Sequence, residues 1–347
     1  MKIVSLFSGA GGLDLGFKMA GHTIIWANDL YTDAVETYKY NLGNHIYCRD
    51  IFSVNENEVP DCDIIIGGFP CQGFSVAGKM DPDDERSKLI WSFLDVVDMV
   101  KPRMFIMENV KALGKLEKWK EIRKAFVERA QQKGYFCQFT VLNASEFGVS
   151  QNRERVFFVG SNQPYDIFKL SLCLEDEKKK PQTLRELLGN LPPAGSDENP
   201  LTCTAKITLA AFPVMRKSPY AGMIFNGMGR PLNLDAVSST LPASMGGNKT
   251  PIIDCRVLDD PDHPDWVKEY HKGLMDGRIE PDFTLAPDHL RRITILESAI
   301  IQSFPPSYQF KGTKSAVYTQ IGNAVPCKLA ESIARAAISV CLQENAS

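Results

Sequence analysis

The sequence of 347 residues contains no apolar run long enough to cross a bilayer, and no charged-then-apolar leader near residue 1. Hydrophobic residues make up 44% and charged residues 23%, which is the balance of an ordinary globular protein. We therefore expect a cytoplasmic protein. The length is sufficient for one large α/β unit and a smaller second domain.

The sequence also lacks the residue patterns of metal sites and of disulfide frameworks. The five histidines show no metal-ligand spacing, and the nine cysteines include no Cys-x-x-Cys pair. An odd and dispersed set of cysteines indicates reduced thiols rather than a disulfide framework. We expect neither a structural nor a catalytic metal.

A net positive charge is missing as well. The formal net charge is −3, whereas nucleic-acid-binding domains are usually basic. Charge alone therefore favours a soluble metabolic enzyme. A DNA-binding groove would need Lys and Arg to gather locally on one face.

The first half of the chain alternates short β-rich runs with helical patterns, which is typical of a doubly wound, Rossmann-like α/β sheet. Expected strands lie at residues 3–7, 23–27, 64–66, 104–107, 139–142 and 156–159. The last two are expected to form an antiparallel pair at the sheet edge.

From about residue 160 to 288 the chain is rich in Pro, Gly, Asp and Asn, which indicates a smaller, loop-rich domain. Its short strand and helix signals fall at 208–212, 223–225 and 252–257. Near the end of the chain, residues 328–342 have the pattern of an amphipathic helix.

A glycine-rich turn, Phe-Ser-Gly-Ala-Gly-Gly at residues 7–12, follows the first expected strand. Such glycines let the backbone turn tightly and approach a ligand closely. Asp14 stands where the dinucleotide fingerprint has its last glycine, which disfavours a nicotinamide or flavin enzyme.

Two acids follow at strand ends. Asp29 is placed where a ribose diol is held, and Asp50 could accept from an adenine amino group. Each is equally well explained as a cap or turn residue. Together with the glycine turn they indicate an adenosine-containing ligand.

Cys71 lies in Gly-Gly-Phe-Pro-Cys-Gln-Gly-Phe-Ser at residues 67–75, directly after the strand expected at 64–66. Doubly wound sheets bind ligands at the carboxyl ends of their strands. An arbitrary cysteine is more often a buried, inert thiol. The turn of small and polar residues around this one favours a reactive nucleophile instead.

Glu108 ends the next expected strand, at 104–107. A carboxylate that emerges from an apolar strand into a cleft is expected to have a raised pKa and to deliver a proton; the alternative is an acid that caps the next helix. Neighbouring strand ends would bring Cys71 and Glu108 to one edge of the sheet.

Arg153 and Arg155 alternate in Gln-Asn-Arg-Glu-Arg, just before the last expected strand. They would project to the same side and hold a carbonyl oxygen or a phosphate. The alternative is a set of salt bridges with Glu154.

In this order the motifs resemble those of the cytosine-5 DNA methyltransferase family of restriction–modification systems. The likeness continues at residues 291–294, 302–305 and 322–325. It implies a catalytic and cofactor-binding domain at 1–180, a target-recognition domain at 181–290, and a return segment at 291–347 that completes the first domain. Within 181–290 the likeness is weak.

The resemblance also implies S-adenosylmethionine as the cofactor. The residues expected to line its site are Phe7, Ala10, Gly12, Asp29, Leu30, Asp50, Ile51, Gly68, Leu89, Asn323 and Ala324. Leu30 departs from the family pattern, because an aromatic residue that stacks on adenine often stands there.

In the implied reaction the thiolate of Cys71 adds to carbon 6 of cytosine, which makes carbon 5 enamine-like. Glu108 would protonate ring nitrogen 3 or donate a hydrogen bond to it, Arg155 would hold the exocyclic oxygen, and Arg153 would order the loop around the thiol. The target base must be flipped out of the duplex. The expected DNA contacts are Ser75, Lys79, Arg86 and Thr240.

Double-stranded DNA is thus the expected partner, the protein is expected to be a monomer, and a cognate restriction endonuclease is expected to act separately. One alternative is a transfer-RNA cytosine-5 methyltransferase, although that branch's Cys-Phe-Thr motif is not found here. A second is a catalytically inactive DNA-binding regulator, which the retention of Cys71 and Glu108 disfavours. A metabolic Rossmann enzyme is the third.

Overall fold

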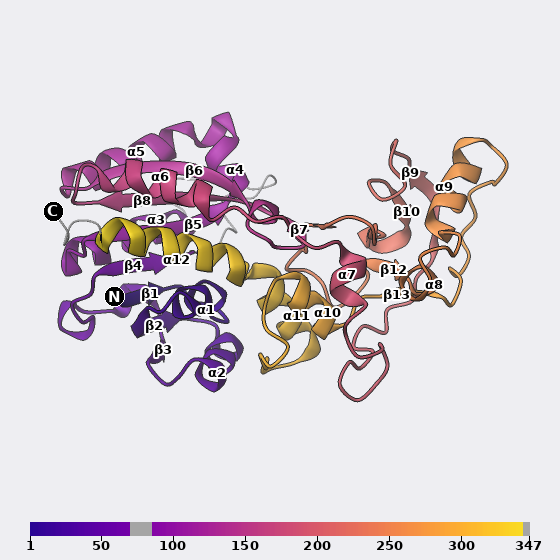
Figure 1. Ribbon diagram of the computed structural model, residues 1–347, viewed down its shortest axis with the longest axis horizontal. Coiled ribbons are helices and arrows are strands. Elements are labelled where there is room, and N and C mark those ends of the chain that lie inside the picture. The colour runs from indigo at the N-terminus through magenta and orange to yellow at the C-terminus, as the bar shows by residue number, and fades with distance from the viewer. Residues whose placement is uncertain (70–84, 343–347) are drawn as a thin grey trace.

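A computed structural model describes residues 1–69 and 85–342, with the backbone alone at residues 56, 85–87 and 342. The chain forms a large lobe built on a sheet and a small lobe beyond it (Figure 1). Three helices lie between the lobes: α7 (Leu184–Leu188), α10 (Ile295–Ile301) and α11 (Lys314–Asn323). No helix in the described part of the chain is both long and apolar enough to span a membrane.

The large lobe contains a seven-stranded sheet with the order β3-β2-β1-β4-β5-β8-β6. The first five of these strands run parallel, whereas β8 is antiparallel to both β5 and β6. The doubly wound α/β class and the antiparallel pair at the edge are thereby confirmed. The strands are β1 (Lys2–Leu6), β2 (Thr23–Asp29), β3 (Ile46–Cys48), β4 (Ile64–Gly67), β5 (Met104–Val110), β6 (Phe136–Asn143) and β8 (Glu154–Ser161).

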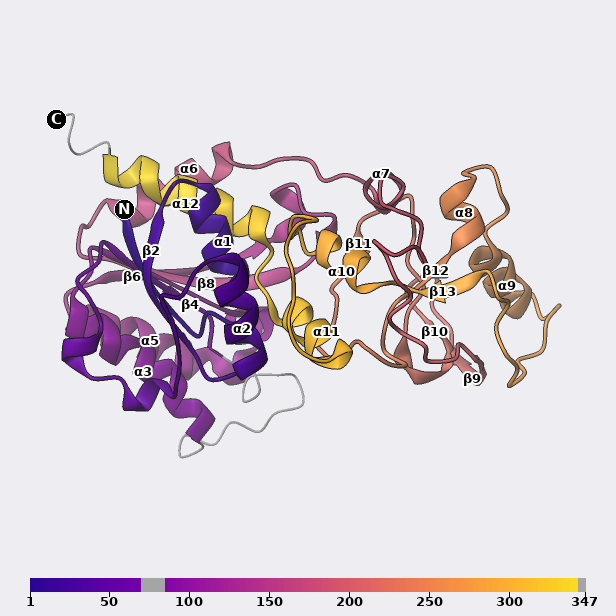
Figure 2. The same ribbon diagram turned by 90° about the horizontal axis from the view of Figure 1, so that it is seen from below.

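Helices cover both faces of this sheet because its strands are apolar on both sides. One face packs against α1 (Gly12–Met19), α2 (Thr32–Asn41), α6 (Asp166–Asp176) and α12 (Cys327–Leu342). The other packs against α3 (Glu85–Val100), α5 (Lys120–Gln132) and the short α4 (Lys111–Lys115). Figure 2 shows the sheet between these two layers.

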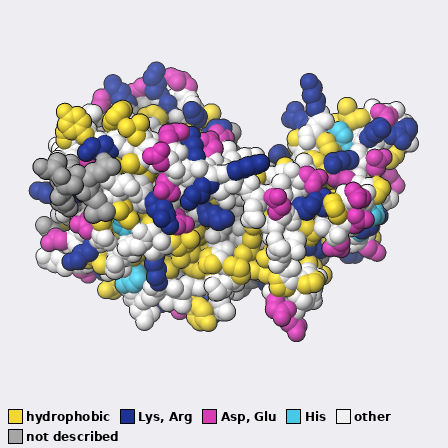
Figure 3. Space-filling model, viewed as in Figure 1, with side chains coloured by type: hydrophobic (Ala, Val, Ile, Leu, Met, Phe, Trp, Pro, Cys, Tyr) yellow, Lys and Arg dark blue, Asp and Glu magenta, His cyan; other side chains and the backbone are white. Residues whose placement is uncertain are grey.

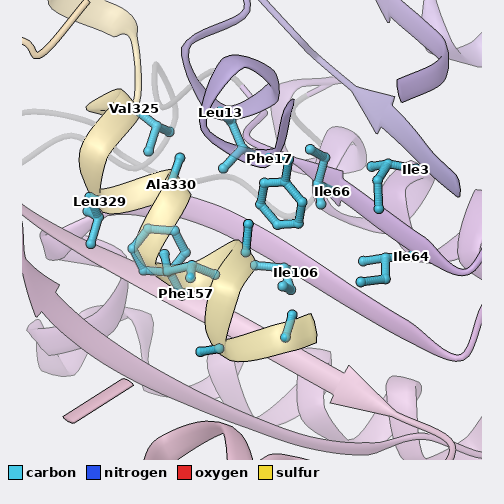
Figure 4. Packing of buried hydrophobic residues seen from close by; sticks show 14 of the residues in the cluster. Ile3, Leu13, Phe17, Ile64, Ile66, Ile106, Phe157, Val325, Leu329 and Ala330 are labelled. Carbon is cyan, nitrogen blue, oxygen red and sulfur yellow. The ribbon is translucent and has the colours of Figure 1, made fainter. Parts of the chain in front are cut away.

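The helix expected at 328–342 is α12, and it returns to the N-terminal part of the sheet. Figure 4 shows Leu329 and Ala330 of α12 near Phe17 of α1, with Ile66 and Ile106 of the sheet beside them. The last helix of the chain and the first therefore share one apolar layer.

The small lobe has an apolar core of its own, formed between a hairpin and a helix. Strands β9 (Leu209–Val214) and β10 (Met223–Phe225) pair antiparallel and pack against α9 (Trp266–Met275). The apolar run at 252–257 is divided: β12 (Ile252–Asp254) pairs with β13 (Leu290–Arg292), and α8 (Cys255–Asp259) follows. The division has a local cause, because the Asp254 side chain accepts the backbone N–H of Arg256 and so caps the helix.

A further apolar cluster joins the segments between the lobes. It contains Leu184 and Leu241 of the predicted target-recognition domain together with Ile293, Tyr318 and Cys327 of the predicted return segment. Residues on both sides of position 290 thus share a core. The domain boundaries at 180 and 290 stay a prediction.

Gly16 marks the closest approach of α1 and α12. A Cβ there would lie 2.6 Å from both the carbonyl oxygen of Cys327 and the backbone nitrogen of Glu331. We expect Gly16→Ala to lower the free energy of unfolding by about 2 kcal/mol, because overpacking outweighs the gain in helix propensity. Denaturant titration measures this. Gly247→Ala, whose Cβ would meet no atom within 4 Å, is the matched control, and equal effects of the two variants would refute the packing argument.

Candidate catalytic and cofactor site

A cavity of about 700 Å³ opens at the carboxyl ends of β1, β2, β4 and β5. Ligand-binding cavities commonly have volumes of about 300–1,000 Å³. The described residues of its wall come from the ends of these strands, the glycine turn with the start of α1, residues 30–34, Arg153 and Arg155, residues 240–243 and residues 319–325. The predicted adenosine site and the predicted catalytic carboxylate therefore share one cavity.

The glycine turn is held in a strained, ordered conformation at the end of β1. Phe7, Gly9 and Gly11 have φ angles of 54°, 54° and 82°, which for the phenylalanine is unusual. The carboxylate of Asp29 accepts the backbone N–H of Gly9 at 2.7 Å and that of Tyr31 at 2.7 Å. The acid at the end of β2 thus fixes the turn, and its oxygens keep further acceptor capacity.

The return segment lies directly on this turn. A Cβ at Gly12 would stand 2.5 Å from the carbonyl oxygen of Val325 and 3.1 Å from the Cβ of Ala324. The buried hydroxyl of Tyr308 donates a hydrogen bond to the carbonyl oxygen of Ala10. No motif pointed to Tyr308, whose partner is 298 positions away in the sequence.

Most of the predicted cofactor residues line the cavity. These are Phe7, Ala10, Gly12, Asp29, Leu30, Gly68, Asn323 and Ala324. Leu30 is 67% exposed, which leaves its side chain open to a flat ligand ring. Whether each of these residues contacts a cofactor stays a prediction.

Three predicted cofactor residues are placed elsewhere than on the described wall. Asp50 is exposed and caps the short 3₁₀ helix η1 (Ile51–Ser53) by accepting the backbone N–H of Phe52. Ile51 is buried in the apolar layer beneath α3, and Leu89 packs half-buried against the same layer. Their contact with a cofactor also stays a prediction.

Glu108 lies at the end of β5 and is 8% exposed. The guanidinium of Arg155, at the start of β8, forms an ion pair with it, with Nε 3.0 Å from Oε1. Burial raises the pKa of Glu108 above its ordinary value, and the positive charges of Arg155 and Arg153 oppose this without reversing it. The site therefore favours the protonated form of this carboxyl more than water does.

Gly68 makes room for that carboxyl. A Cβ at this position would lie 2.8 Å from Oε2 of Glu108. The side chain of Asn109 donates a hydrogen bond of 3.1 Å to the carbonyl oxygen of Phe69. The chain that follows β4 is therefore fixed next to the acid up to residue 69, a role of Asn109 that we did not predict.

The remaining predicted residues divide into two groups. Cys71, Ser75 and Lys79 lie outside the described residues, as does the side chain of Arg86. Thr240 is exposed on the cavity wall, and its hydroxyl donates to the carbonyl oxygen of Asn152 at 2.7 Å.

Arg153 is 1% exposed. Its Nη2 donates to the carbonyl oxygen of Gly322 at 2.7 Å, and its Nη1 donates to that of Leu241 at 3.3 Å. Both arginines line the cavity. Arg155 forms an ion pair with Glu108, whereas Arg153 joins two distant segments. That Arg153 orders the loop around Cys71 stays a prediction.

Asp14 is a second buried acid in the cavity wall. Its carboxyl accepts the hydroxyls of Ser5 and Tyr38, both at 2.9 Å. Burial raises the pKa of Asp14 to about 7, although these two hydrogen bonds lower it. In the sequence, Asp14 stood out only because it replaces the last glycine of the dinucleotide fingerprint. Its burial could not be predicted, because it depends on how the turn between β1 and α1 packs in the fold.

This raised pKa predicts a pH dependence of stability. A carboxyl whose pKa is about 7 when folded and near 3.8 when unfolded stabilises the fold below pH 4, and the contribution is lost as pH rises towards 7. We expect the free energy of unfolding of the wild type, relative to Asp14→Asn, to fall by about 2 kcal/mol from pH 5 to pH 7. Chemical denaturation at several pH values measures it; parallel curves would contradict the burial argument.

No group of three or more His, Cys, Asp or Glu side chains suited to a metal ion occurs among residues 1–69 and 85–342.

Comparison with solved structures supports the fold alone. The methyltransferase EhMeth of Entamoeba histolytica matches with a TM-score of 0.69 and 17% identity, covering 98% of each chain. The Dnmt2 methyltransferase of S. pombe matches with a TM-score of 0.65 and 19% identity, covering 99% of each chain.

Comparison with curated sequences is more specific. The chain is 36% identical to the type II methyltransferase M.NgoFVII of Neisseria gonorrhoeae, over 96% of its own length and 86% of the relative's. It is 34% identical to the type II methyltransferase M.MthTI of Methanothermobacter thermautotrophicus, over 96% of each. The family model for the C-5 cytosine-specific DNA methylase matches residues 1–339. The chain therefore belongs to the C-5 cytosine-specific DNA methylase family.

Proposed function

We propose that this protein flips a cytosine out of double-stranded DNA and methylates its carbon 5, with S-adenosylmethionine as methyl donor and Cys71 as the nucleophile. The observation that carries the proposal is the buried Glu108–Arg155 pair in the wall of a cavity that also holds the glycine turn. An acid that can keep its proton, and a fixed guanidinium beside it, suit the ring nitrogen and the exocyclic oxygen of one pyrimidine.

The described wall fits S-adenosylmethionine. The turn at residues 7–12 exposes backbone at the end of β1, Asp29 keeps acceptor capacity for ribose hydroxyls, and Leu30 offers an apolar surface for adenine. The carboxyls of Asp14 and Asp29 give this wall acidic groups on the side of the glycine turn. When bound, this cofactor supplies a methyl group made electrophilic by its sulfonium charge.

Carbon 5 of cytosine is a poor nucleophile until a group adds to carbon 6. We assign that addition to the thiolate of Cys71, which forms a sulfur–carbon bond and moves electron density towards nitrogen 3. Glu108 donates its proton there, and Arg155 holds the exocyclic oxygen, so that the added charge is stabilised at two atoms. After methyl transfer the proton on carbon 5 is lost to a base, Cys71 leaves by elimination as the thiolate, and nitrogen 3 returns its proton to Glu108.

The place of Cys71 in this proposal rests on its position in the sequence. Phe69, whose carbonyl is bound by Asn109 beside Glu108, is the last described residue before it. Chain connectivity is thus what favours a thiol at this cavity.

A hollow between the two lobes offers a place for the duplex. Figure 3 shows this hollow with Lys and Arg side chains on both of its sides. Local basic charge of this kind attracts the DNA backbone although the net charge of the chain is −3. Thr240, exposed at the cavity on the way to the small lobe, is a proposed contact near the flipped base.

The proposal includes the biological role of the protein and its domain organisation. The relatives named above are type II methyltransferases. We extend the proposal to protection of host DNA against a separate restriction endonuclease, by a monomeric protein of the cytoplasm. The three-part division at residues 180 and 290 belongs to the same proposal, with 181–290 choosing the target sequence.

Bisulfite sequencing of genomic DNA from cells that express the protein tests the function. We expect protected cytosines within one short sequence, absent from cells expressing Cys71→Ala. Methyl incorporation into transfer RNA instead of DNA would replace the proposal by the transfer-RNA alternative. DNA binding without any methylation would replace it by the inactive regulator.

A further inference from the structure

A buried polar cluster lies where the large lobe, the target-recognition segment and the return segment meet. It consists of Gln151 on β7 (Gln151–Asn152), Arg153, and Gln302 just after α10. Gln151 and Gln302 are fully buried. Arg153 contributes to the cavity wall and, besides its electrostatic effect on Glu108, donates hydrogen bonds to the backbone of two distant segments.

On one side, the cluster holds the segment that leads to the small lobe. β7 pairs parallel with β11 (Ser238–Ser239). The side-chain oxygen of Gln151 accepts the backbone N–H of Leu241 at 3.0 Å, and Arg153 donates to the carbonyl oxygen of the same residue. Both backbone polar groups of Leu241 are therefore bound by this cluster.

On the other side, the cluster holds the segment that closes the cofactor cavity. The Gln302 amide donates to the carbonyl oxygens of Ile321 at 2.9 Å and of Ala324 at 2.6 Å, and Arg153 donates to that of Gly322. Gln151 donates to the Gln302 side-chain oxygen and so connects the two halves.

The two held segments also touch each other and the glycine turn. A Cβ at Gly322 would lie 2.6 Å from the carbonyl oxygen of Pro242, and one at Gly12 would lie 2.5 Å from that of Val325. A displacement of residues 240–243 therefore meets backbone at 322, and a displacement of 324–325 meets backbone at 12, because close-packed groups transmit such shifts.

We propose that Gln151, Arg153 and Gln302 are positioning residues that couple DNA binding at residues 240–243 to cofactor binding at the glycine turn, an inference that rests on the proposed function. DNA that fixes the first segment fixes the wall of the cofactor cavity through this cluster. Because such coupling is reciprocal, the cofactor strengthens DNA binding by the same factor.

The test measures the factor by which one ligand strengthens binding of the other, rather than enzymatic activity. The dissociation constant of S-adenosylhomocysteine, an unreactive probe of the cofactor cavity, is measured by calorimetry without and with a duplex that carries the target sequence. We expect the duplex to tighten binding of the wild type at least about fivefold. In Gln151→Met and in Gln302→Met the factor is expected to fall below about twofold, and in the double variant to fall no further.

Tyr135→Phe is the matched control, because it removes a buried hydrogen bond to the carbonyl oxygen of Pro102 in the apolar layer of α3 and α5, outside the described cavity wall. It should keep the wild-type factor. A merely structural role would weaken each ligand's own binding and leave the factor unchanged in the Met variants, which would overturn the proposal. So would a factor of one in the wild type.

Amide hydrogen exchange of the wild-type protein is a second test of the coupling, and it needs no variant. The probe alone is expected to slow exchange at the amide of Leu241, and the duplex alone at that of Ala324. Protection confined to each ligand's own segment overturns the coupling. Failure of the proposed function is distinct, since the wild type would then methylate no DNA in the bisulfite experiment.

Discussion

Glu108→Gln is expected to lower the rate of methyl transfer by a factor of about 10²–10⁴, the usual contribution of a positioned general acid. The amide has the size of the carboxyl and can donate a hydrogen bond, but it has no acidic proton to give to a ring nitrogen. The loss should appear in single-turnover rates on duplex DNA, while the affinity for S-adenosylhomocysteine changes little.

The pH profile adds a readout of its own. Since burial raises the pKa of Glu108, the wild-type rate should fall on the alkaline side as this carboxyl loses its proton. Glu108→Gln should lack that limb. The control is Glu154→Gln at the first residue of β8, which removes a half-exposed partner of Lys111 and no part of the described cavity wall. A Glu108→Gln rate within about threefold of the wild type would show that the acid has no chemical role.

Cys71→Ala is expected to lower the same rate by about 10⁴-fold or more, because without addition at carbon 6 the ring carbon stays unreactive. Binding of DNA and of S-adenosylhomocysteine should persist. Cys173→Ala, on α6 and away from the cavity, is the matched control and should stay within about twofold of the wild type. Methylation by Cys71→Ala at a tenth of the wild-type rate would exclude the thiol as nucleophile.

Six of the seven strands of the large sheet could be predicted from sequence because buried strands are short, apolar and set off by turns. The seventh, β3, was not expected, because only one of its three residues is buried. The same reasoning brought Glu108 to the carboxyl edge of the sheet, because β4 and β5 are neighbours with Gly67 opposite Met107. The strand was expected to end at Met107, whereas β5 continues to Val110 and contains Glu108. Its ion pair with Arg155 follows from register, because Arg155 stands opposite Val110 on the antiparallel β8.

Other features depend on contacts that local patterns do not record. An acidic residue after a strand, such as Asp50, is expected both for a group that binds adenine and for a helix cap. In the structure Asp50 caps η1. Two carbonyl oxygens that accept hydrogen bonds from Arg153 lie 88 and 169 positions away in the sequence. That distance explains why alternation with Arg155 predicted a shared side but not a bridge between two segments.

A duplex that carries 5-fluorocytosine at the methylated position tests the central claim most directly. Fluorine on carbon 5 cannot leave as a proton, so elimination of the sulfur is blocked once the methyl group has been transferred. We predict a protein–DNA adduct that survives denaturation, requires S-adenosylmethionine, and maps by mass spectrometry to Cys71. No adduct with the active wild type, or an adduct that persists in Cys71→Ala, would contradict the account.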